Sequence, residues 1–299
     1  MRLGVVFPQT EIGSDPAVIR DYAQAAESAG YDHLLVFDHV LGGTLERFDK
    51  LGRTPPYTDQ SPFHEVFVLF GFLGACTQRL ELVTGIVILP QRQTALVAKQ
   101  AAQIDVLSGG RLRLGIGVGW NAVEFEALNE TFENRGRRSA EQIAVLRALW
   151  TQRVVDFRGE FHRISHAGLN PMPIQRPIPI WFGVGSREQP VPPDAALRRI
   201  ARLADGWSPN FAPDETGRKL VAQVHDYARA SGRDPASLPL EGRVRLAGQG
   251  PEGWAKQVQA WKGLGATSII AEPRNAGLRF PDGHLDVLHR FQDTLKEAS

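Results

Sequence analysis

The sequence is poor in the features that stabilise small secreted proteins. Among its 299 residues there is one cysteine, Cys76. A single cysteine forms no internal disulfide and supplies no Cys-type zinc site. A chain of this length buries a large hydrophobic core without such crosslinks. We therefore predict a globular protein without a structural metal.

The sequence also lacks long apolar runs and a charge excess of either sign. No apolar stretch reaches the ~20 residues that a membrane-spanning helix needs, and residues 1–7 resemble a strand rather than a signal peptide. The 34 basic and 33 acidic residues leave a formal net charge of +1. Because nucleic-acid-binding surfaces need a clear basic excess, we expect neither nucleic acid nor membrane as a partner. A cytoplasmic location is the expectation.

An alternation of strand and helix runs from one end of the chain to the other. The expected strands cover residues 2–7, 33–37, 82–89, 111–117, 178–182, 207, 243–247 and 267–271. The expected helices cover residues 16–30, 63–77, 94–107, 138–150, 195–203, 215–230, 253–263 and 284–297. Eight strands that each precede a helix favour an α/β fold, a parallel (β/α)₈ TIM barrel, over an open doubly wound sheet.

Three long irregular segments interrupt this alternation. They lie at about residues 41–62, 118–135 and 152–177, and the last contains a short expected β-hairpin at 154–164. No shift in composition marks a second domain. We therefore expect residues 1–299 to form a single TIM-barrel domain with loop insertions at these three places.

The active site of such a barrel lies at the carboxyl ends of its strands. That rule singles out Asp38, His39, Thr84, Gly85, Gly119, Trp120, Asn121, Gly183, Val184, Gly185 and Ser186. The set holds one histidine, glycines and an aromatic side chain, but no nucleophile–base pair. Such a pocket suits a large planar cofactor that carries the chemistry itself.

These segments also admit other interpretations. The glycines of residues 115–119 lack the spacing of a dinucleotide-binding loop. The glycines of residues 183–186 precede a helix, where backbone amides favour a phosphate. Asp38 and Glu124 are a distant alternative, the two facing carboxylates of a glycoside hydrolase. His162 and His166 are four residues apart outside a helix, so a metal-ligand role is not expected.

The chain resembles the luciferase-like monooxygenases, and most closely their F-420-dependent oxidoreductase branch. The resemblance covers nearly the whole chain and is most specific in residues 82–90, 98–100, 104–111, 115–121 and 124–125, with support from 135–138, 178–183 and 204–207. Several long matches in the same order are strong evidence for the family. They are weak evidence for the substrate, because one fold accommodates many different functions.

The resemblance implies a site for an isoalloxazine-like ring in the barrel mouth. It implies a non-proline cis peptide at Gly85–Ile86 against the ring, with Thr84, Ile86 and Gly119 also at the cofactor. The pair Asp38–His39 matches one that lies near the reactive carbon in deazaflavin enzymes. The segment of Gly183, Val184, Gly185 and Ser186 matches one that holds the cofactor phosphate or tail.

One position departs from the family pattern. Deazaflavin-dependent sugar-phosphate dehydrogenases of this family carry a glutamate where this chain has Trp120. A sugar oxidation that depends on that acid is therefore in doubt.

These observations favour hydride transfer between coenzyme F-420 and a small organic substrate. His39 would be the hydrogen-bond donor or acid–base group, with Asp38 beside it in the catalytic set, and Trp120 and Asn121 would shape the substrate pocket. Arginine outnumbers lysine, as in high-GC genomes where this coenzyme is frequent. The alternatives are an FMN-dependent two-component monooxygenase, served by a separate flavin reductase, and a non-catalytic flavin-binding protein. The resemblance also suggests a homodimer.

Overall fold

We describe a computed structural model of the chain, which covers residues 1–52, 54–185 and 189–297. Nine strands form one sheet in the order β3-β2-β1-β11-β10-β9-β8-β5-β4, and β3 also pairs with β5. Paired neighbours such as β1–β2, β1–β11 and β8–β9 run parallel. This order is that of a closed (β/α)₈ barrel in which one strand is present in two pieces, β3 and β4.

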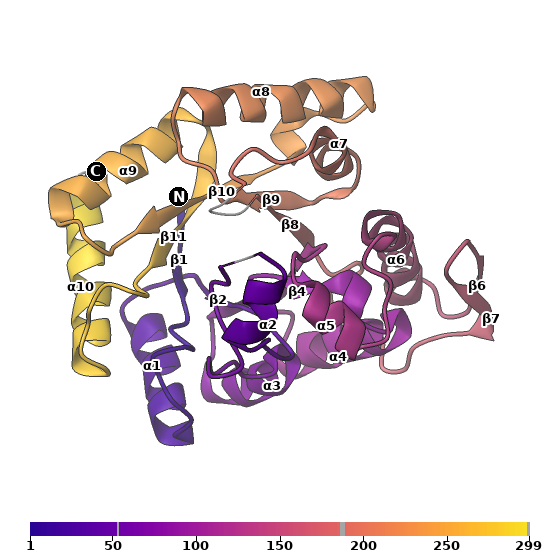
Figure 1. The fold of residues 1–299 in the computed structure, drawn as a ribbon, viewed down its shortest axis with the longest axis horizontal. Coiled ribbons are helices and arrows are strands. Elements are labelled where there is room, and N and C mark those ends of the chain that lie inside the picture. The colour runs from indigo at the N-terminus through magenta and orange to yellow at the C-terminus, as the bar shows by residue number, and fades with distance from the viewer. Residues whose placement is uncertain (53, 186–188, 298–299) are drawn as a thin grey trace. The chain divides into compact units, whose positions relative to one another are not determined.

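By its internal contacts the chain divides into two compact units. Unit 1 holds residues 1–36, 76–83 and 180–299, and unit 2 holds residues 37–75 and 84–179. The single domain expected from the sequence stays a prediction. Figure 1 shows the helices and strands of both units with their labels.

Unit 1 carries most of the parallel strands, together with the helices that cover them (Figure 1). Its elements are β1 (Arg2–Val6), α1 (Pro16–Ser28), β2 (His33–Val36), β3 (Glu81–Thr84, whose last residue belongs to unit 2), β8 (Ile180–Val184), α7 (Asp194–Leu203), β9 (Gly206–Pro209), α8 (Glu215–Ala230), the 3₁₀ helix η2 (Pro235–Ser237), β10 (Leu240–Arg245), α9 (Pro251–Gly263), β11 (Ala266–Glu272) and α10 (Asp282–Glu297).

Helix α1 shows how local sequence produces these elements. The Asp15 side chain caps its first turn by accepting a hydrogen bond from the backbone N–H of Ala17, and Pro16 occupies the first helical position. Its buried residues are Ile19, Tyr22, Ala23 and Ala26, the apolar stripe read from the sequence. The spacing of that stripe turns one helix face toward the core.

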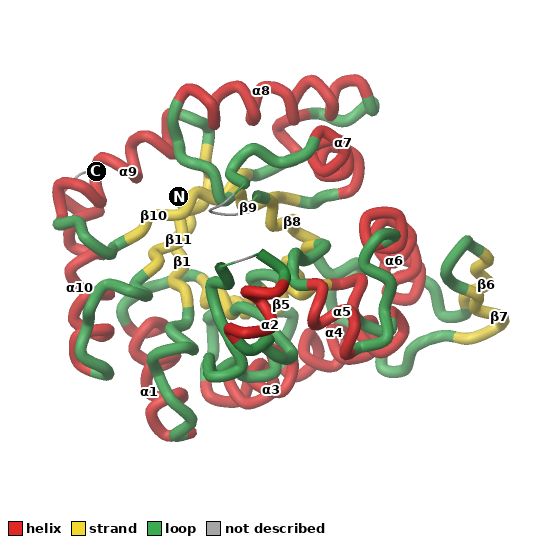
Figure 2. The backbone as a smooth tube through the Cα atoms, viewed as in Figure 1, coloured by secondary structure: helices red, strands yellow, loops and turns green. Residues whose placement is uncertain are grey.

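Unit 2 carries the longer connecting segments, which Figure 2 shows as loops around short helices. Its elements are α2 (Leu45–Lys50), α3 (Val66–Cys76, whose last residue belongs to unit 1), β4 (Val87–Ile88), the 3₁₀ helix η1 (Leu89–Gln91), α4 (Thr94–Leu107), β5 (Leu112–Gly117), α5 (Ala122–Ala127), α6 (Arg135–Thr151), β6 (Val155–Arg158) and β7 (Arg163–Ala167). The antiparallel β6–β7 pair is the hairpin expected from the sequence.

Two segments expected to be irregular contain short helices. Thr44 accepts a hydrogen bond from the N–H of Arg47 at the start of α2, and Asn121 caps α5 in the same way through Val123. Both helices are six residues long and lie within the segments expected at about 41–62 and 118–135, of which only the first is rich in Gly and Pro. The helix expected from residue 138 begins three residues earlier, at Arg135.

The strand expected at residues 82–89 is interrupted. It ends as β3 at Thr84, and it resumes as β4 only at Val87. The peptide bond between Gly85 and Ile86 is cis, as the resemblance implied. The expectation of one continuous strand was therefore wrong, because two residues at its centre leave the hydrogen-bonded ladder.

Candidate active site in unit 2

A buried carboxylate, Glu124 on α5, is the centre of the polar cluster of unit 2. Its side chain is 0% exposed. Its two oxygens accept hydrogen bonds from Val40 N at 2.9 Å, Leu41 N at 3.4 Å, Tyr57 Oη at 3.1 Å, Gln91 Nε2 at 3.5 Å and His39 Nδ1 at 3.4 Å. With all these donors in place, Glu124 acts as a fixed negative charge.

The hydrogen bonds keep this carboxylate ionised despite its burial. Burial raises the pKa of Glu124, but the hydrogen bonds from His39, the Val40 N–H and Tyr57, together with attraction to the imidazole, outweigh it and hold the pKa below its usual range. Burial and the neighbouring Glu124 charge raise the pKa of the Tyr57 hydroxyl, which therefore stays protonated and donates to the carboxylate.

The His39 side chain lies between the carboxylate and an aromatic wall. Its ring centre is 3.9 Å from that of Tyr57 and 4.8 Å from that of Phe63. Its Nδ1 faces the anionic Glu124, so this nitrogen carries the proton and donates. Nε2 is then the hydrogen-bond acceptor of the ring, and the side chain remains 17% exposed. The cluster thus presents one oriented imidazole.

Asp38 neighbours His39 in sequence but faces different partners. The Arg92 guanidinium binds both of its oxygens, at 2.7 and 3.2 Å, and reaches Glu65 at 3.1 Å. Burial raises the pKa of Asp38, and the Arg92 charge opposes that rise. Attraction to Asp38 and Glu65 outweighs burial and raises the pKa of Arg92, so the guanidinium stays charged. Asp38 therefore fixes the loop beside His39.

The hydrogen bonds to the Asp38 and Glu124 carboxyl groups argue against the glycoside hydrolase alternative. Each oxygen of Asp38 is bound by Arg92, and each oxygen of Glu124 accepts at least two hydrogen bonds. A glycoside hydrolase needs one carboxyl group free to give a proton and one free to attack or to activate water. Neither group is free for that work.

Trp120 and Asn121 have different surroundings, although both were predicted to shape a substrate pocket. Trp120 is half-buried, and its ring packs against Tyr57 and Phe48 at 5.6 and 5.9 Å between ring centres. Asn121 is 1% exposed. Its Nδ2 donates to Tyr57 Oη at 2.8 Å, while its Oδ1 caps α5. Asn121 thus positions Tyr57, and Trp120 keeps an exposed part.

The residues predicted at the cofactor ring lie around the strand interruption. Thr84 is buried, and its hydroxyl donates to the Gly115 carbonyl at 2.7 Å, so it supports the backbone of β5. Gly85 and Ile86 are half-buried. Gly119 has φ +72°, and a Cβ there would lie 2.6 Å from Ile88 Cγ2. These positions combine accessible backbone with little side-chain bulk.

The glycine-rich turn predicted to hold the cofactor phosphate belongs to unit 1. Gly183 and Val184 end β8, and Gly185 follows with φ +79°. The Asn210 side chain donates to the Gly185 carbonyl at 3.0 Å, and the Asn210 N–H donates to Val184 at 2.9 Å. Ser186 lies outside the described residues. The phosphate-binding role of this turn stays a prediction.

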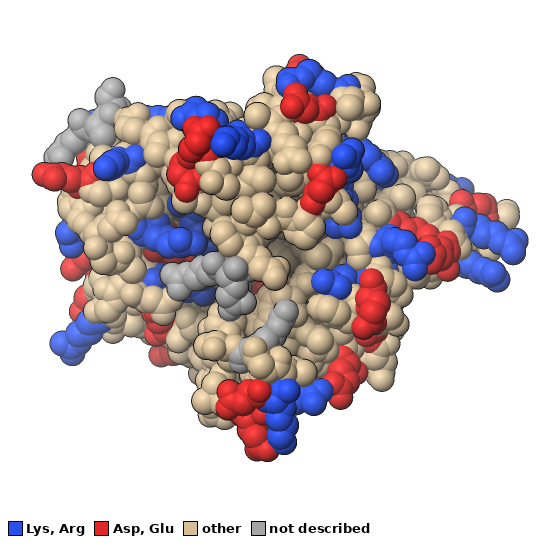
Figure 3. Space-filling view, turned by 45° about the horizontal axis from the view of Figure 1, so that its top comes forward, with Lys and Arg blue, Asp and Glu red and all other residues tan. Residues whose placement is uncertain are grey.

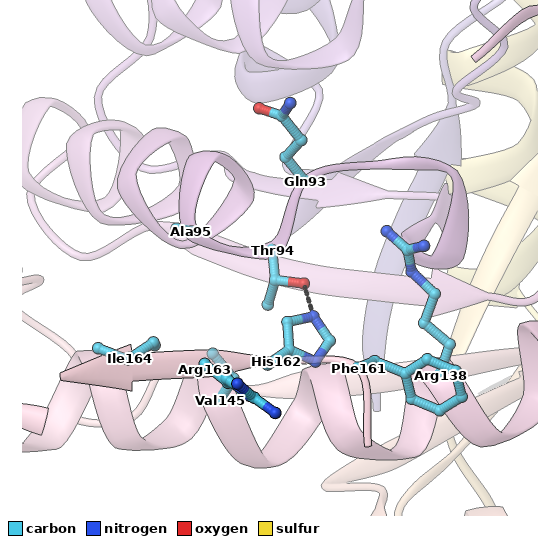
Figure 4. A pocket seen from close by; sticks show the side chains of 9 residues that line it. All are labelled: Gln93, Thr94, Ala95, Arg138, Val145, Phe161, His162, Arg163 and Ile164. Carbon is cyan, nitrogen blue, oxygen red and sulfur yellow. Dashed lines mark hydrogen bonds between the residues drawn. The ribbon is translucent and has the colours of Figure 1, made fainter. Parts of the chain in front are cut away.

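A separate cavity of about 380 Å³ lies beside the hairpin of unit 2, and Figure 4 shows its lining. His162 is one of the lining residues, with Nδ1 2.8 Å from Glu141 Oε1 and Nε2 2.6 Å from Thr94 Oγ1. Glu141 also accepts the backbone N–H groups of residues 160–162. The contacts explain His162 as an anchor of the hairpin on α4 and α6.

Several residues of this cluster were not predicted from the sequence as site residues. Tyr57 and Phe63 come from or border the segment expected to be an irregular loop, and Arg92 follows η1. Glu124 was considered only as a hydrolase carboxylate. Two aromatic residues in a polar loop after a barrel strand are a usable signal, but their partner Glu124 is 67 residues from Tyr57 along the chain.

Comparison with known proteins identifies the family. The model of the luciferase-like monooxygenase family matches residues 1–268. The chain belongs to the luciferase-like monooxygenase family. Its relatives and structural neighbours are oxidoreductases and monooxygenases, so it is an enzyme of the oxidoreductase class.

Two relatives show how far the sequence similarity extends. An uncharacterised protein of Mycobacterium tuberculosis is 38% identical over 232 residues, 76% of this chain and 77% of that protein. The FMNH(2)-dependent dimethylsulfone monooxygenase of Pseudomonas fluorescens is 32% identical over 244 residues, 81% of this chain and 60% of that enzyme.

Solved structures confirm the barrel fold. The structure of an F-420-dependent secondary alcohol dehydrogenase, in complex with an F-420–acetone adduct, has a TM-score of 0.78 at 17% identity and covers 100% of this chain and 99% of its own. At this identity the likeness shows the fold alone. The (β/α)₈ TIM barrel expected from the sequence is confirmed.

Two further properties concern membrane-spanning helices and surface charge. Within the described part of the chain, no helix is both long enough and apolar enough to cross a bilayer. Basic and acidic side chains are interspersed on the face drawn in Figure 3. That face therefore carries mixed charge.

Proposed function

We propose that this oxidoreductase transfers hydride between coenzyme F-420 and a small organic substrate that bears a hydroxyl or carbonyl group. The observation that carries the proposal is the oriented His39 imidazole, which is backed by the ionised Glu124. Interconversion of an alcohol and a carbonyl moves a hydride and a proton separately. The deazaflavin supplies the hydride chemistry when bound, and the protein has to handle the proton.

The residues of unit 2 fit a flat ring system. Gly85 and Gly119 carry no side chain, and both they and Ile86 are partly exposed. A side chain at position 119 would collide with Ile88, so this loop approaches the strand as closely as glycine permits. Accessible backbone with little side-chain bulk suits a planar heterocycle with hydrogen-bonding edges.

His39 serves as the acid–base group in this proposal. When an alcohol is oxidised, Nε2 takes the hydroxyl proton while the hydride leaves the carbon, and in the reverse direction Nε2 returns the proton to the oxygen. The Glu124 charge stabilises the imidazolium that forms. Tyr57 and Asn121 hold Glu124 in place, and the exposed part of Trp120 borders the substrate.

A second candidate is an FMN-dependent two-component monooxygenase. The observation that favours it is the 32% identity to an FMNH(2)-dependent dimethylsulfone monooxygenase. In that case a separate flavin reductase would be a partner. For either candidate we propose a homodimer, with the apolar outer face of α3 and α4 as the contact.

A binding titration decides between the two cofactors. Purified protein is titrated with F-420 and with FMN, each oxidised and reduced, and the binding is followed by fluorescence. The proposal expects tight binding of F-420 alone. Tight binding of reduced FMN would replace it with the monooxygenase, and binding of neither cofactor would overturn both.

Replacement of His39 tests the proton-transfer role. With the cofactor identified and a substrate found, His39→Ala should lower turnover by roughly 10²–10⁴-fold, the usual contribution of a general acid–base group, and leave cofactor binding nearly unchanged. His166→Ala is the matched control, since the His166 side chain is 81% exposed. Unchanged turnover in His39→Ala would remove this residue from the mechanism.

A further inference from the structure

A second polar cavity lies in unit 1, at the carboxyl ends of two barrel strands. It measures about 200 Å³, and its polar lining comes from Asn210, Arg243, Arg245, Gln249 and Gln257. Strand β9 ends at Pro209 and β10 at Arg245, so the cavity belongs to the end of the barrel that carries function in this fold. None of these residues has a role in the function proposed above.

Arginine side chains gather around the cavity, since Arg243 and Arg245 line it and Arg274 lies near Arg243. Arg243 and Arg274 share one carboxylate, Glu272, with N–O distances of 3.2 Å and of 2.7 and 3.1 Å. The other nearby carboxylate, Glu241, pairs with His33 at 2.9 Å. Arg245 adds a further guanidinium at the exposed side of the cavity.

The pKa of Arg243 reflects the neighbouring guanidinium charges. Burial lowers the pKa of Arg243, and although Glu272 and Glu241 oppose that effect, the charges of Arg274 and Arg245 add to it, so the pKa stays below its usual range. Burial raises the pKa of Glu272, but its hydrogen bond and attraction to Arg274 outweigh it, so the carboxylate is ionised. An added anion would relieve the repulsion among the guanidinium groups.

Side-chain amides hold the cavity wall in place. Gln257 accepts from the Arg245 N–H at 3.2 Å and donates to the Arg245 carbonyl at 3.1 Å. It also donates to Gln249 Oε1 at 2.8 Å. On the opposite side, Asn210 is tied to the Gly185 carbonyl at 3.0 Å. The backbone that carries Arg245 is therefore positioned before any ligand arrives.

We propose that this cavity binds the oxyanion group of an organic ligand, with Arg243 and Arg245 as its guanidinium donors. The group is a carboxylate, a sulfonate or a phosphate, because planar guanidinium groups pair well with such oxygens. Its source is either the side chain of the cofactor or the substrate itself. Loops after the late strands of (β/α)₈ barrels commonly hold phosphates, which agrees with this placement.

The first experiment needs neither cofactor nor substrate. Inorganic phosphate is titrated into the full-length protein by calorimetry at constant ionic strength, with chloride as the comparison. We expect saturable binding that Arg245→Gln weakens at least tenfold. Arg229→Gln is the matched control, because Arg229 is an exposed arginine on α8 that pairs with Asp226, and it should bind phosphate as the wild type does.

Two results would overturn the proposal: phosphate binding no stronger than that of chloride, or undiminished binding in Arg245→Gln. Arg243 is more deeply buried, so Arg243→Lys is the second variant. It keeps the charge but loses the planar donors, and it should also bind phosphate more weakly while retaining the wild-type circular dichroism spectrum. Phosphate binding of Arg243→Lys equal to that of the wild type would remove Arg243 from the site.

A further titration separates the two sources of the anion. F-420 and FMN are titrated into the wild type and into Arg245→Gln. Cofactor affinity that falls at least tenfold in the variant assigns the oxyanion to the cofactor. Unchanged cofactor affinity, with phosphate still bound by the cofactor-loaded wild type, assigns it to the substrate. Because the phosphate titration stands alone, the cavity is tested even if neither cofactor binds.

Discussion

At the scale of single residues, the two adjacent polar side chains after β2 have separate tasks. Asp38 binds Arg92 with both oxygens, whereas His39 faces Glu124. Both residues follow the end of β2, yet their side chains meet partners from different parts of the chain. The imidazole thus depends on a carboxylate 85 residues away in sequence rather than on its neighbour.

The pKa of Glu124 gives the stability of the protein a defined pH dependence. The usual pKa of a glutamate is 4.5. In the folded protein, burial raises the pKa of Glu124, but the hydrogen bonds from His39, Val40 and Tyr57 have the larger effect, and the pKa lies below 4.5. A depressed folded-state pKa means that the ionised group stabilises the fold above pH 4.5 and that this contribution is lost as the pH falls through the folded-state value.

Replacement of Glu124 by Gln should remove that contribution. At pH 7 we expect the free energy of unfolding to fall by about 2 kcal/mol, because charge-assisted hydrogen bonds are lost. Urea unfolding at several pH values should show the difference from wild type shrinking below pH 4.5. Glu126→Gln on the same helix is the control, since the Glu126 side chain is 70% exposed. A difference that is constant with pH would contradict this role.

At the scale of elements, a side chain of α1 caps the turn between α3 and β3. Glu27 accepts the backbone N–H groups of Gln78, Arg79 and Leu80, at distances of 2.6 to 3.1 Å. Burial raises the pKa of Glu27, but these hydrogen bonds outweigh it and lower the pKa. One helix therefore satisfies the backbone of the segment that leads into the interrupted strand.

Removal of this cap should destabilise the protein without affecting the site directly. Glu27→Ala leaves three backbone donors without their acceptor, and we expect a loss of roughly 1–3 kcal/mol in the free energy of unfolding. Chemical denaturation measures it. Asp21→Ala, an exposed position on the same helix, is the control and should change stability by less than about 0.5 kcal/mol. Equal effects of the two substitutions would contradict the capping role.

At the scale of the whole molecule, one apolar surface of unit 2 has the features of a contact between copies. Helix α3 is apolar over nearly its whole circumference, with Val68 73% and Phe72 38% exposed. Helix α4 adjoins it through Gly71 and Ile104 and exposes Leu107 at 63%. Large exposed apolar side chains on adjoining helices favour association.

The proposed homodimer can be tested at this surface. The double variant Val68→Glu with Phe72→Glu should be monomeric, because unpaired charges are costly to bury in an interface. Light scattering after size exclusion gives the mass of the wild type and of the variant. Val191→Glu, at a residue that is 54% exposed in unit 1, should remain dimeric. A monomeric wild type at micromolar concentration would refute the proposal.

Local sequence patterns predicted most of the helices and strands. Helix α8 has the predicted bounds, and α1 has the predicted cap and stripe. These features depend on residues within one or two turns of each other, which a pattern can read. The helices α2 and α5 were missed because each is only six residues long and lies within a segment that was expected to be a loop.

By itself the sequence determined the main order of strands and helices and the barrel class, and it predicted His39 as a site residue, because periodicity and strand ends are local properties. Only the tertiary structure decided which groups meet: Glu124 with His39 and Tyr57, Asp38 with Arg92, and Arg243 with Glu272. These partners lie tens of residues apart and approach only when the strands pair. Burial then sets their charges, since a carboxylate out of water stays ionised only where enough donors surround it.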